Sequence, residues 1–347
     1  MRPLPILSFG GTIMNWEISK TAVQGPSCSP VLSIVIVTWN GKRYALECLE
    51  SLRANGGKCP TEIIVVDNAS TDGTPEAIRI QFPEVHVIQN CDNLGFAKAN
   101  NIGVRQSRGK YVCLINSDVV VPPGCLDRML AWMEAHEDVG IMGPKMLCPD
   151  GSVGLSVMRL PTVWNSLCSA LALNSVFPKS KLFAGFSIKT TDVQAIRDVE
   201  VVTGWFWMAS QIALGQVGGL DERFFMYGED IDWCHRFRKA GWRVVFFGEA
   251  EALHYGGASS MDAPAWSYVE MRRANRQYFQ KHHGTLGAIG YTLVIGIHEI
   301  ARIAGYSLSY CYDQGRRREA ISKVRRSLSC LQWLVGGNSL VTRHTGE

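Results

Sequence analysis

The stretch Val-Leu-Ser-Ile-Val-Ile-Val-Thr, residues 31–38, decides the fold class. It is rich in β-branched residues and almost continuously apolar, which is typical of a strand buried on both faces of a parallel sheet. After it, a helical pattern places Leu46, Leu49 and Leu52 on one face. The stretch therefore predicts the first strand and helix of an α/β domain.

Strand and helix patterns alternate after this first unit. Glu62–Asp67 and Tyr111–Ile115 have the same buried-strand character, Val85–Gln89 is a short strand, and Gly95–Ser107 is a helix. Strands that alternate with helices at this spacing indicate a doubly wound, mainly parallel sheet with helices on both faces. In such sheets, ligands bind beyond the carboxyl ends of the strands.

Polar clusters lie where three of the predicted strands end: Thr38-Trp39-Asn40, Asp67-Asn68 and Asn116-Ser117-Asp118. Asp118 is a carboxylate of the kind that holds Mg²⁺ or Mn²⁺ together with substrate phosphates. Asp67 is able to accept a hydrogen bond from a pyrimidine N3–H. Turn formation and helix capping are the alternative explanation for these residue types. The sequence has neither a GxGxxG nor a GxxxxGK[ST] loop, so a bound diphosphate is expected to need a metal.

A second candidate site is the acidic stretch Tyr-Gly-Glu-Asp-Ile-Asp-Trp, residues 227–233. It begins a helix predicted over Asp230–Ala240, which Gly241 ends. Acids at this position complement the helix dipole by about 0.3–1 kcal/mol each, or one of them acts as general base toward an acceptor hydroxyl. His254, near the end of a later strand, is either a metal ligand or a structural histidine.

Composition indicates a globular protein of a reducing compartment. Of the 347 residues, 46% are apolar and 19% are charged, which excludes an intrinsically disordered chain and suffices for one large α/β domain or two smaller ones. The 11 cysteines are odd in number and contain no CxxC, as is typical of cytosolic proteins. We therefore expect a cytoplasmic protein.

Three segments fall outside the α/β pattern. Residues 1–30 predict an irregular N-terminal extension, and Pro149–Val199 predicts an insertion or acceptor-side loop region. Residues 271–347 contain 12 Lys and Arg against 4 Asp and Glu, a net charge of +8. An apolar helix over Leu286–Tyr310 and a basic helix over Arg316–Arg326 are expected, without the ~18–20 continuous apolar residues of a membrane span. Two explanations remain open: peripheral contact with the inner face of the plasma membrane, or a helical hairpin packed on the α/β domain.

Six short motifs occur in a fixed order along the chain: Val-Thr-Trp-Asn (37–40), Val-Asp-Asn-Ala-Ser-Thr-Asp-Gly-Thr (66–74), Asn-Leu-Gly-Phe-Ala-Lys-Ala-Asn-Asn (93–101), Asn-Ser-Asp (116–118), Gly-Leu-Asp-Glu-Arg-Phe-Phe-Met-Tyr-Gly-Glu-Asp-Ile-Asp (219–232) and His-Tyr-Gly-Gly (254–257). Each motif is weak, but the ordered series is highly specific. It resembles family-2 inverting glycosyltransferases of the GT-A fold, in particular the bacterial rhamnosyltransferase-like branch. The resemblance covers residues 31–282 and implies a GT-A domain there, followed by a helical, basic segment over residues 283–347.

The resemblance also implies a role for each motif residue. Asp230 would be the catalytic base with Glu229 as its near rival, while Asp118 and His254 would bind a divalent metal, Mg²⁺ or Mn²⁺. One departure matters, because the usual Asp-x-Asp reads Asn-Ser-Asp here and leaves a single carboxylate. The residues implied in nucleotide-sugar binding are Thr38, Asn40, Asp67, Asn68, Asn93, Gly95, Asn100 and Asn116.

The implied activity is inverting transfer of a sugar, with rhamnose from dTDP-rhamnose favoured, to a hydroxyl of a glycan or lipid-linked glycan acceptor. Such a reaction belongs to bacterial surface-polysaccharide or cell-wall synthesis and involves no nucleic acid. A nucleotidyltransferase on a similar core is one alternative, although the chain has no glycine-rich, basic triphosphate loop near the first strand. A catalytically inactive sugar-nucleotide-binding scaffold is another. The joint presence of Asp118, Asp230 and His254 favours the enzyme.

Overall fold

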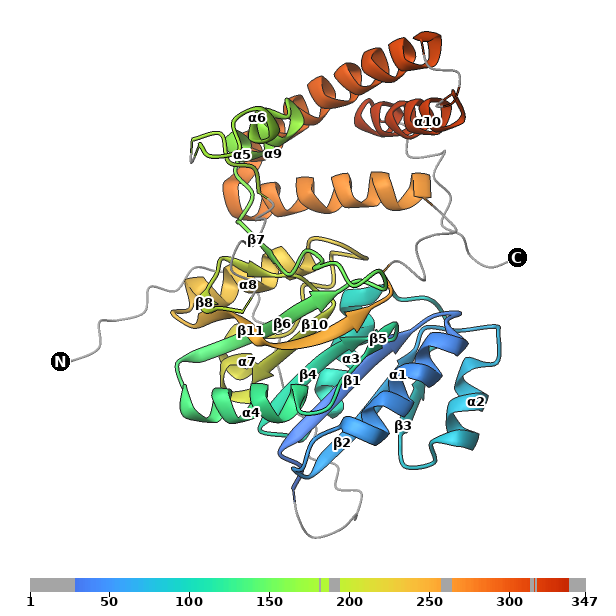
Figure 1. Ribbon diagram of the computed structural model, residues 1–347, viewed down its shortest axis with the longest axis vertical. Coiled ribbons are helices and arrows are strands. Elements are labelled where there is room, and N and C mark those ends of the chain that lie inside the picture. Colours follow the sequence, from blue (N-terminus) through green and yellow to red (C-terminus); the bar gives the residue numbers. More distant parts are fainter. Residues whose placement is uncertain are drawn as a thin grey trace, which may run out of the picture.

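The first predicted strand lies inside a nine-stranded sheet. The computed structural model describes residues 29–180, 182–186, 194–256, 264–312, 315 and 317–336. Within these ranges the strand order is β3-β2-β1-β4-β10-β6-β11-β5, and β8 pairs with β11 (Figure 1). The strands of this sheet are β1 (Leu32–Thr38), β2 (Thr61–Asp67), β3 (His86–Gln89), β4 (Tyr111–Asn116), β5 (Val119–Val120), β6 (Val139–Leu147), β8 (Ile196–Asp198), β10 (Phe206–Ser210) and β11 (Arg243–His254). A separate ribbon pairs β7 (Val157–Met158) with β9 (Val201–Val202).

Six of these nine strands run in one direction. β1 to β4 are parallel, as are β6 and β11, and β10 separates the two groups as an antiparallel neighbour of both β4 and β6. β5 and β8 are antiparallel to β11. The mainly parallel sheet expected from the sequence is therefore confirmed. The direction of β10 was not foreseen, because a strand buried on both faces is apolar whichever way it runs.

Helices cover both faces of the sheet, as predicted. Side chains alternate along β1: Ile34 and Ile36 share a core with α1 and α4, while Val35 shares one with α3 and α8. The helices are α1 (Lys42–Asn55), α2 (Thr74–Gln81), α3 (Phe96–Gln106), α4 (Cys125–Ala135), α5 (Val163–Ala170), α6 (Leu173–Val176), α7 (Gln211–Val217), α8 (Glu229–Lys239), α9 (Pro264–Tyr312) and α10 (Arg317–Leu334). The expected loop region Pro149–Val199 therefore contains α5, α6 and short strands.

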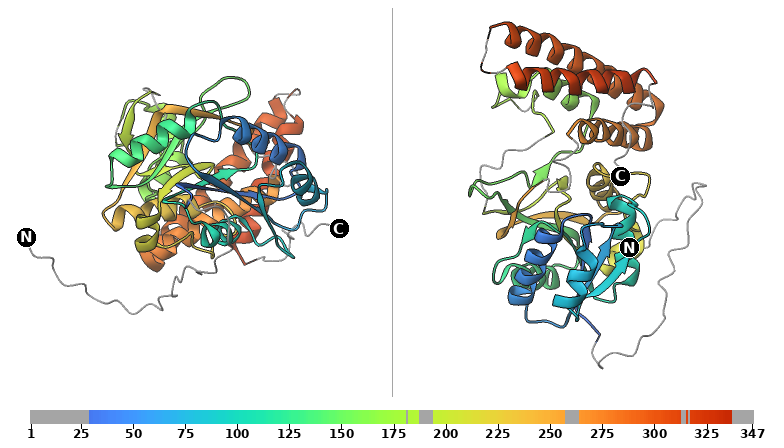
Figure 2. Two further views of the ribbon diagram at one scale, coloured as in Figure 1. Left: turned by 90° about the horizontal axis from the view of Figure 1, so that it is seen from below. Right: turned by 90° about the vertical axis from the view of Figure 1, so that its right-hand side faces the viewer.

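The C-terminal helices stand over one end of the sheet domain (Figures 1 and 2). α9 bends at Gly284, whose φ of 67° and ψ of −168° are not helical, so that two limbs fold back on one another. α5 and α10 pack against α9. The Ala265–Tyr312 helix is long and apolar enough to cross a membrane by length and composition alone. Most of the predicted N-terminal extension, residues 1–28, lies outside the described residues.

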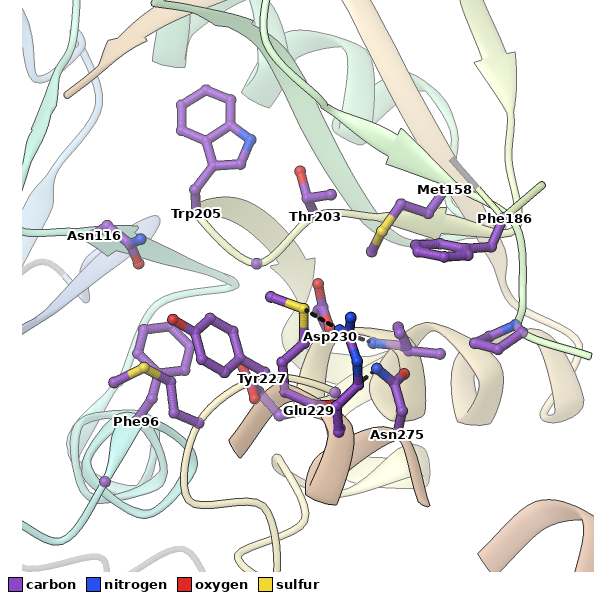
Figure 3. Close-up of a pocket in the computed structure, with 18 of the residues that line it drawn as sticks. Phe96, Asn116, Met158, Phe186, Thr203, Trp205, Tyr227, Glu229, Asp230 and Asn275 are labelled. Atoms are coloured by element: carbon purple, nitrogen blue, oxygen red, sulfur yellow. Dashed lines mark hydrogen bonds between the residues drawn. The ribbon is translucent and has the colours of Figure 1, made fainter. Parts of the chain in front are cut away.

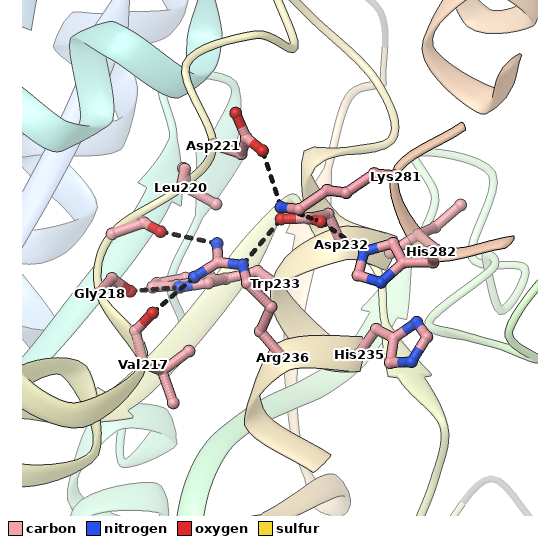
Figure 4. A network of polar contacts seen from close by, with 12 residues as sticks. Val217, Gly218, Leu220, Asp221, Asp232, Trp233, His235, Arg236, Lys281 and His282 are labelled. Carbon is pink, nitrogen blue, oxygen red and sulfur yellow. Dashed lines mark hydrogen bonds and ion pairs between the residues drawn. The ribbon is translucent and has the colours of Figure 1, made fainter. Parts of the chain in front are cut away.

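A buried carboxylate connects helix α8 to the first limb of α9 (Figure 4). Asp232 is 0% exposed and contacts Nε of Arg236 at 2.8 Å, Nε2 of His282 at 2.7 Å and Nζ of Lys281. Lys281 also pairs with Asp221 at 2.7 Å. Arg236 continues the network to the carbonyl oxygens of residues 217 and 219, ahead of α8. The start of α8 is thus held both by α9 and by the segment that precedes α8 in the chain.

We expect Asp232→Asn to lower the free energy of unfolding by about 3–5 kcal/mol at neutral pH, because it leaves buried cations without their counter-charge. Burial acts to raise the pKa of Asp232, but the hydrogen bond from His282 and the charges of Arg236 and Lys281 lower it to about 2. The stabilisation is therefore full above the pKa of an unfolded Asp, about 3.9, and disappears as the pH falls through about 2.

Urea unfolding followed by circular dichroism measures this difference at pH 7 and again near pH 3. Glu76→Gln on the exposed surface of α2 is the matched control and should change stability by less than about 0.5 kcal/mol. Equal stability of the Asp232→Asn and Glu76→Gln proteins at pH 7 would contradict the role given to the buried network.

Candidate functional site

A cavity of about 610 Å³ lies between the carboxyl ends of the strands and the C-terminal helices. Its wall includes the ends of β1 and β4, the start of α8, the segment around α5 and both limbs of α9 (Figure 3). A volume of this size is typical of small-molecule sites. Nine of the residues proposed from the sequence line it: Thr38, Asn68, Asn93, Gly95, Asn116, Asp118, Glu229, Asp230 and His254.

The strand-end side of the cavity contains polar atoms without protein partners. Thr38 is 1% exposed, and its Oγ1 makes no hydrogen bond within the described part of the chain. The same holds for Oδ1 of Asn116. Asn68, by contrast, donates to the carbonyl of Gly95 at 3.2 Å and accepts from Asn90 at 2.9 Å. Because buried polar atoms are normally hydrogen-bonded, the unpaired atoms of Thr38 and Asn116 suit a polar ligand.

Three of the residues proposed to bind a nucleotide-sugar do not line the cavity and lie next to residues that do. Asp67 is fully buried and accepts from the backbone N–H of residue 70 at 2.9 Å. Asn40, at a positive φ of 49°, accepts from the N–H of residue 71 at 2.7 Å. Asn100 donates to the carbonyl of Phe96, one turn earlier in α3. The structure thus gives them contacts that shape the loops and the helix around the cavity, and their part in ligand binding stays a prediction.

Gly95 joins the strand-end side to the loop that precedes α8. Its N–H donates a hydrogen bond to Oδ1 of Asn93 at 3.0 Å, and its φ is +82°. A Cβ at this position would lie 2.5 Å from the carbonyl oxygen of Phe225. That same oxygen accepts from the N–H of Phe96 at 2.7 Å. Glycine is therefore required by both the backbone conformation and the close approach of the two loops.

Asp118 and His254 converge, although 136 positions separate them in the chain. Oδ1 of Asp118 lies 3.1 Å from Nε2 of His254, and Nδ2 of Asn116 lies 3.4 Å from the same nitrogen. Antiparallel pairing of β5 with β11 brings them together, and the ring of His254 stacks on Trp205 at 5.5 Å. No cluster of three or more His, Cys, Asp or Glu suited to a metal occurs among the described residues. A two-ligand site fits a divalent cation that takes its remaining ligands from diphosphate and water.

The two acids at the start of α8 differ in their access to the cavity. Glu229 is only 5% exposed, whereas Asp230 is partly exposed and accepts from the N–H of Ile231 at 2.8 Å. Burial raises the pKa of Asp230, and burial together with the charge of Asp230 raises that of Glu229. A carboxylate with a raised pKa is a better proton acceptor. Gly228, at a φ of 77°, lets the chain turn into α8 at the wall of the cavity.

Several lining residues were not identified from the sequence. Phe186 and Met158 come from the expected acceptor-side region, and Arg272, Tyr291 and His298 come from the limbs of α9. In a single sequence, aromatic and thioether side chains and residues inside a helix cannot be told apart from ordinary core positions. The periodicity of α9 indicates that a face is buried, but it does not reveal that the face borders a cavity.

Comparison with known proteins agrees with this geometry. A family model described as glycosyl transferase family 2 matches residues 33–199. The N-acetylglucosaminyl-diphospho-decaprenol L-rhamnosyltransferase of Mycobacterium tuberculosis is 32% identical over 246 residues, which cover 68% of this chain and 79% of that protein. The low-salt glycan biosynthesis hexosyltransferase Agl10 of Haloferax volcanii is 25% identical over 64% of this chain and 66% of its own length.

Among solved structures, a mannosyltransferase from Pyrobaculum calidifontis superposes with a TM-score of 0.54 at 16% sequence identity, covering 91% of this chain and 89% of that one. This likeness concerns the fold. The sequence relationship to the mycobacterial enzyme is close enough, and covers enough of both chains, to establish the family. The chain therefore belongs to glycosyltransferase family 2 and is a glycosyltransferase.

Proposed function

We propose that the protein inverts the anomeric centre of a sugar as it transfers it from a nucleoside-diphosphate donor to a hydroxyl of a glycan or lipid-linked glycan acceptor. The observation that carries the proposal is that Asp230, a partly exposed residue, lines one cavity with the Asp118–His254 pair. The favoured donor is dTDP-rhamnose and the favoured acceptor is lipid-linked, as the name of the mycobacterial relative suggests. The product would belong to a bacterial surface polysaccharide or cell wall.

Residues on the two sides of the cavity have different proposed tasks, donor binding on one side and proton transfer on the other. Thr38, Asn68 and Asn116 would hold the donor at the strand ends. Asp230 takes the proton of the acceptor hydroxyl while that oxygen attacks the anomeric carbon from the side opposite the diphosphate. The bond between the anomeric carbon and the diphosphate oxygen breaks in the same displacement, which inverts the centre. Glu229 has little access to the cavity and is the less suited base.

Asp118 and His254 would hold Mg²⁺ or Mn²⁺ beside the donor. When bound, a divalent cation offsets the negative charge that develops on the leaving diphosphate. The protein supplies two adjacent ligands here. Asn116 lies within hydrogen-bonding reach of His254 and, with the stacked ring of Trp205, fixes the orientation of the imidazole.

The second limb of α9 supports contact with a membrane surface. Leu286, Ile289, Leu293, Ile297 and Ile300 follow a three-and-four spacing and are 83%, 50%, 64%, 49% and 62% exposed. We call these five residues the apolar stripe. Next to this limb, α10 carries a cluster of basic side chains: Arg317, Arg318, Lys323, Arg325 and Arg326. Exposed apolar residues beside basic ones favour an anionic lipid surface, such as the cytoplasmic face of the plasma membrane.

The reaction class is tested by a donor screen with purified protein, Mg²⁺ or Mn²⁺, a lipid-linked glycan acceptor and a panel of nucleotide sugars. We expect nucleoside diphosphate release from dTDP-rhamnose, reduced about 10²–10⁴-fold in Asp230→Asn because the general base is lost. Asp150→Asn, a change on an exposed loop, is the control and should retain activity. Pyrophosphate release from a nucleoside triphosphate would favour a nucleotidyltransferase, and donor binding without turnover in the wild type would favour a scaffold.

The metal site is tested by titrating Mn²⁺ into the same assay. Asp118→Asn removes the only carboxylate of the pair, so the Mn²⁺ concentration for half-maximal activity should rise by at least about tenfold. Asp150→Asn again serves as the control. An unchanged titration curve in Asp118→Asn would exclude this residue as a metal ligand.

Membrane contact is tested by flotation with vesicles that contain anionic phospholipid. We expect the wild type to float and the double variant Leu286→Glu, Leu293→Glu to remain in the dense fraction, because it places two charges in the apolar stripe. Ile80→Glu, which changes an equally exposed apolar residue on α2, is the matched control. Flotation of all three proteins to the same extent would rule out the stripe as the contact surface.

A further inference from the structure

The cavity continues past Asp230 into an apolar compartment. In Figure 3, Asn116 and Trp205 lie on one side of Asp230 and Thr203, and Met158 and Phe186 lie on the other. Tyr291 and Ile295 from the second limb of α9 extend the apolar wall. The donor needs the polar, strand-end side, so this second compartment is left for the acceptor.

Arg272 lines this cavity, and its guanidinium has N–H groups without strong hydrogen-bond acceptors in the described residues. Its Nη2 donates to the hydroxyl of Tyr268 at 3.0 Å, and within the described part of the chain the hydrogen-bond partner of its Nη1 is the thioether of Met271, at 3.7 Å. Its Nε has no hydrogen-bond partner there. The guanidinium carbon also lies 4.3 Å from the centre of the Tyr268 ring. A guanidinium carries five N–H donors, and a thioether is a weak acceptor. Most of the hydrogen-bonding capacity of Arg272 is therefore unused.

The charges around Arg272 leave a positive excess. Glu299 is 0% exposed and lies 3.7 Å from Nε of Arg272 and 3.8 Å from Nε of Arg302, and it also accepts from Tyr268 at 2.6 Å. One carboxylate thus faces two guanidinium groups. Because one carboxylate neutralises only one of the two guanidinium groups, this cluster keeps a net positive charge, and Arg272 is the member that lines the cavity, where an anion would meet it.

The compartment borders the helix that carries the apolar stripe. An α-helix turns about 100° per residue, so Tyr291, Ile295 and His298 lie on the face opposite to the stripe. Ile295 is 7% exposed, whereas Leu293 is 64% exposed. One limb of α9 therefore presents its inner face to the cavity and its outer face to the surroundings.

We infer that Arg272 binds the phosphate groups of an acceptor that carries a hydrocarbon chain on its diphosphate, and that Met158, Phe186 and Ile295 contact the first part of that chain. The inference rests on the proposed function, including its lipid-linked acceptor, and adds to it the residues that recognise the diphosphate and the chain. The acceptor sugar then lies between Arg272 and Asp230, with its hydroxyl at the carboxylate. An ammonium would match a phosphate less well, because a guanidinium donates two parallel hydrogen bonds.

Binding of farnesyl diphosphate tests this subsite without requiring turnover. The whole protein is titrated with farnesyl diphosphate in EDTA, and again with Mn²⁺ and dTDP present to fill the donor side. We expect binding under both conditions, weakened about tenfold to a hundredfold in Arg272→Gln and less in Arg272→Lys. Arg273→Gln is the matched control, because Arg273 is the next residue of α9 and pairs with Glu270 instead of lining the cavity.

Phe186→Ala separates the apolar contact from the ionic one, and guards against a folding defect in the Arg272 variants. It should weaken farnesyl diphosphate binding while leaving inorganic pyrophosphate binding within about twofold. The inference is overturned if Arg272→Gln binds farnesyl diphosphate as the wild type does, if dTDP with Mn²⁺ displaces it, or if farnesol binds as tightly. The donor screen reports separately on the proposed function, so a failure there leaves these binding outcomes readable.

Discussion

The interaction on which the site depends is the burial of Asp232 among Arg236, Lys281 and His282. Arg236 belongs to α8 itself and the other two partners belong to α9, so the charge of Asp232 has its full set of partners only when α9 is in place. The same contacts fix the first turn of α8, where Asp230 meets the cavity. A buried ion pair contributes little net stability compared with an apolar core. Its role here is to fix the position of the first turn of α8, which carries Glu229 and Asp230, relative to α9.

The sheet and the strand-end side of the site were predictable because their signals are local. Apolar runs such as residues 31–38 identify buried strands, and a polar cluster after each strand identifies the edge where ligands bind. Asp118 needed no long-range information to be named. Its partner His254 did, since the pairing of β5 with β11 that joins them has no local sequence signature. The ordered motifs supplied that connection through resemblance to a family.

For the proposed acceptor side, the sequence indicated the region Pro149–Val199 but not the individual residues or their neighbours from α9, and the reason is physical. The residues of this side, among them Phe186, Arg272 and Tyr291, come from elements that meet only through the bend at Gly284 and the packing of α5 on α9. Gly284 lies between His283 and Thr285, with further glycines at 287 and 290, and the sequence gives no indication at which of these glycines a helix would bend. The bend in α9 also means that the two explanations of the basic segment, membrane contact and packing on the α/β domain, do not exclude one another. The helices pack on the domain and still leave an apolar stripe exposed.

The wide separation of the cavity residues along the chain has a consequence for biosynthesis. At about 5–20 residues per second, His298 leaves the ribosome on the order of 10–50 seconds after Thr38. The residues of the polar, strand-end wall are therefore synthesised before those of the wall formed by α9. A nascent chain that ends before α9 carries the residues of the strand-end side of this cavity and lacks those of the opposite side. The cavity has all its walls only after residue 298 has been synthesised, because Arg272, Tyr291 and His298 line its side formed by α9.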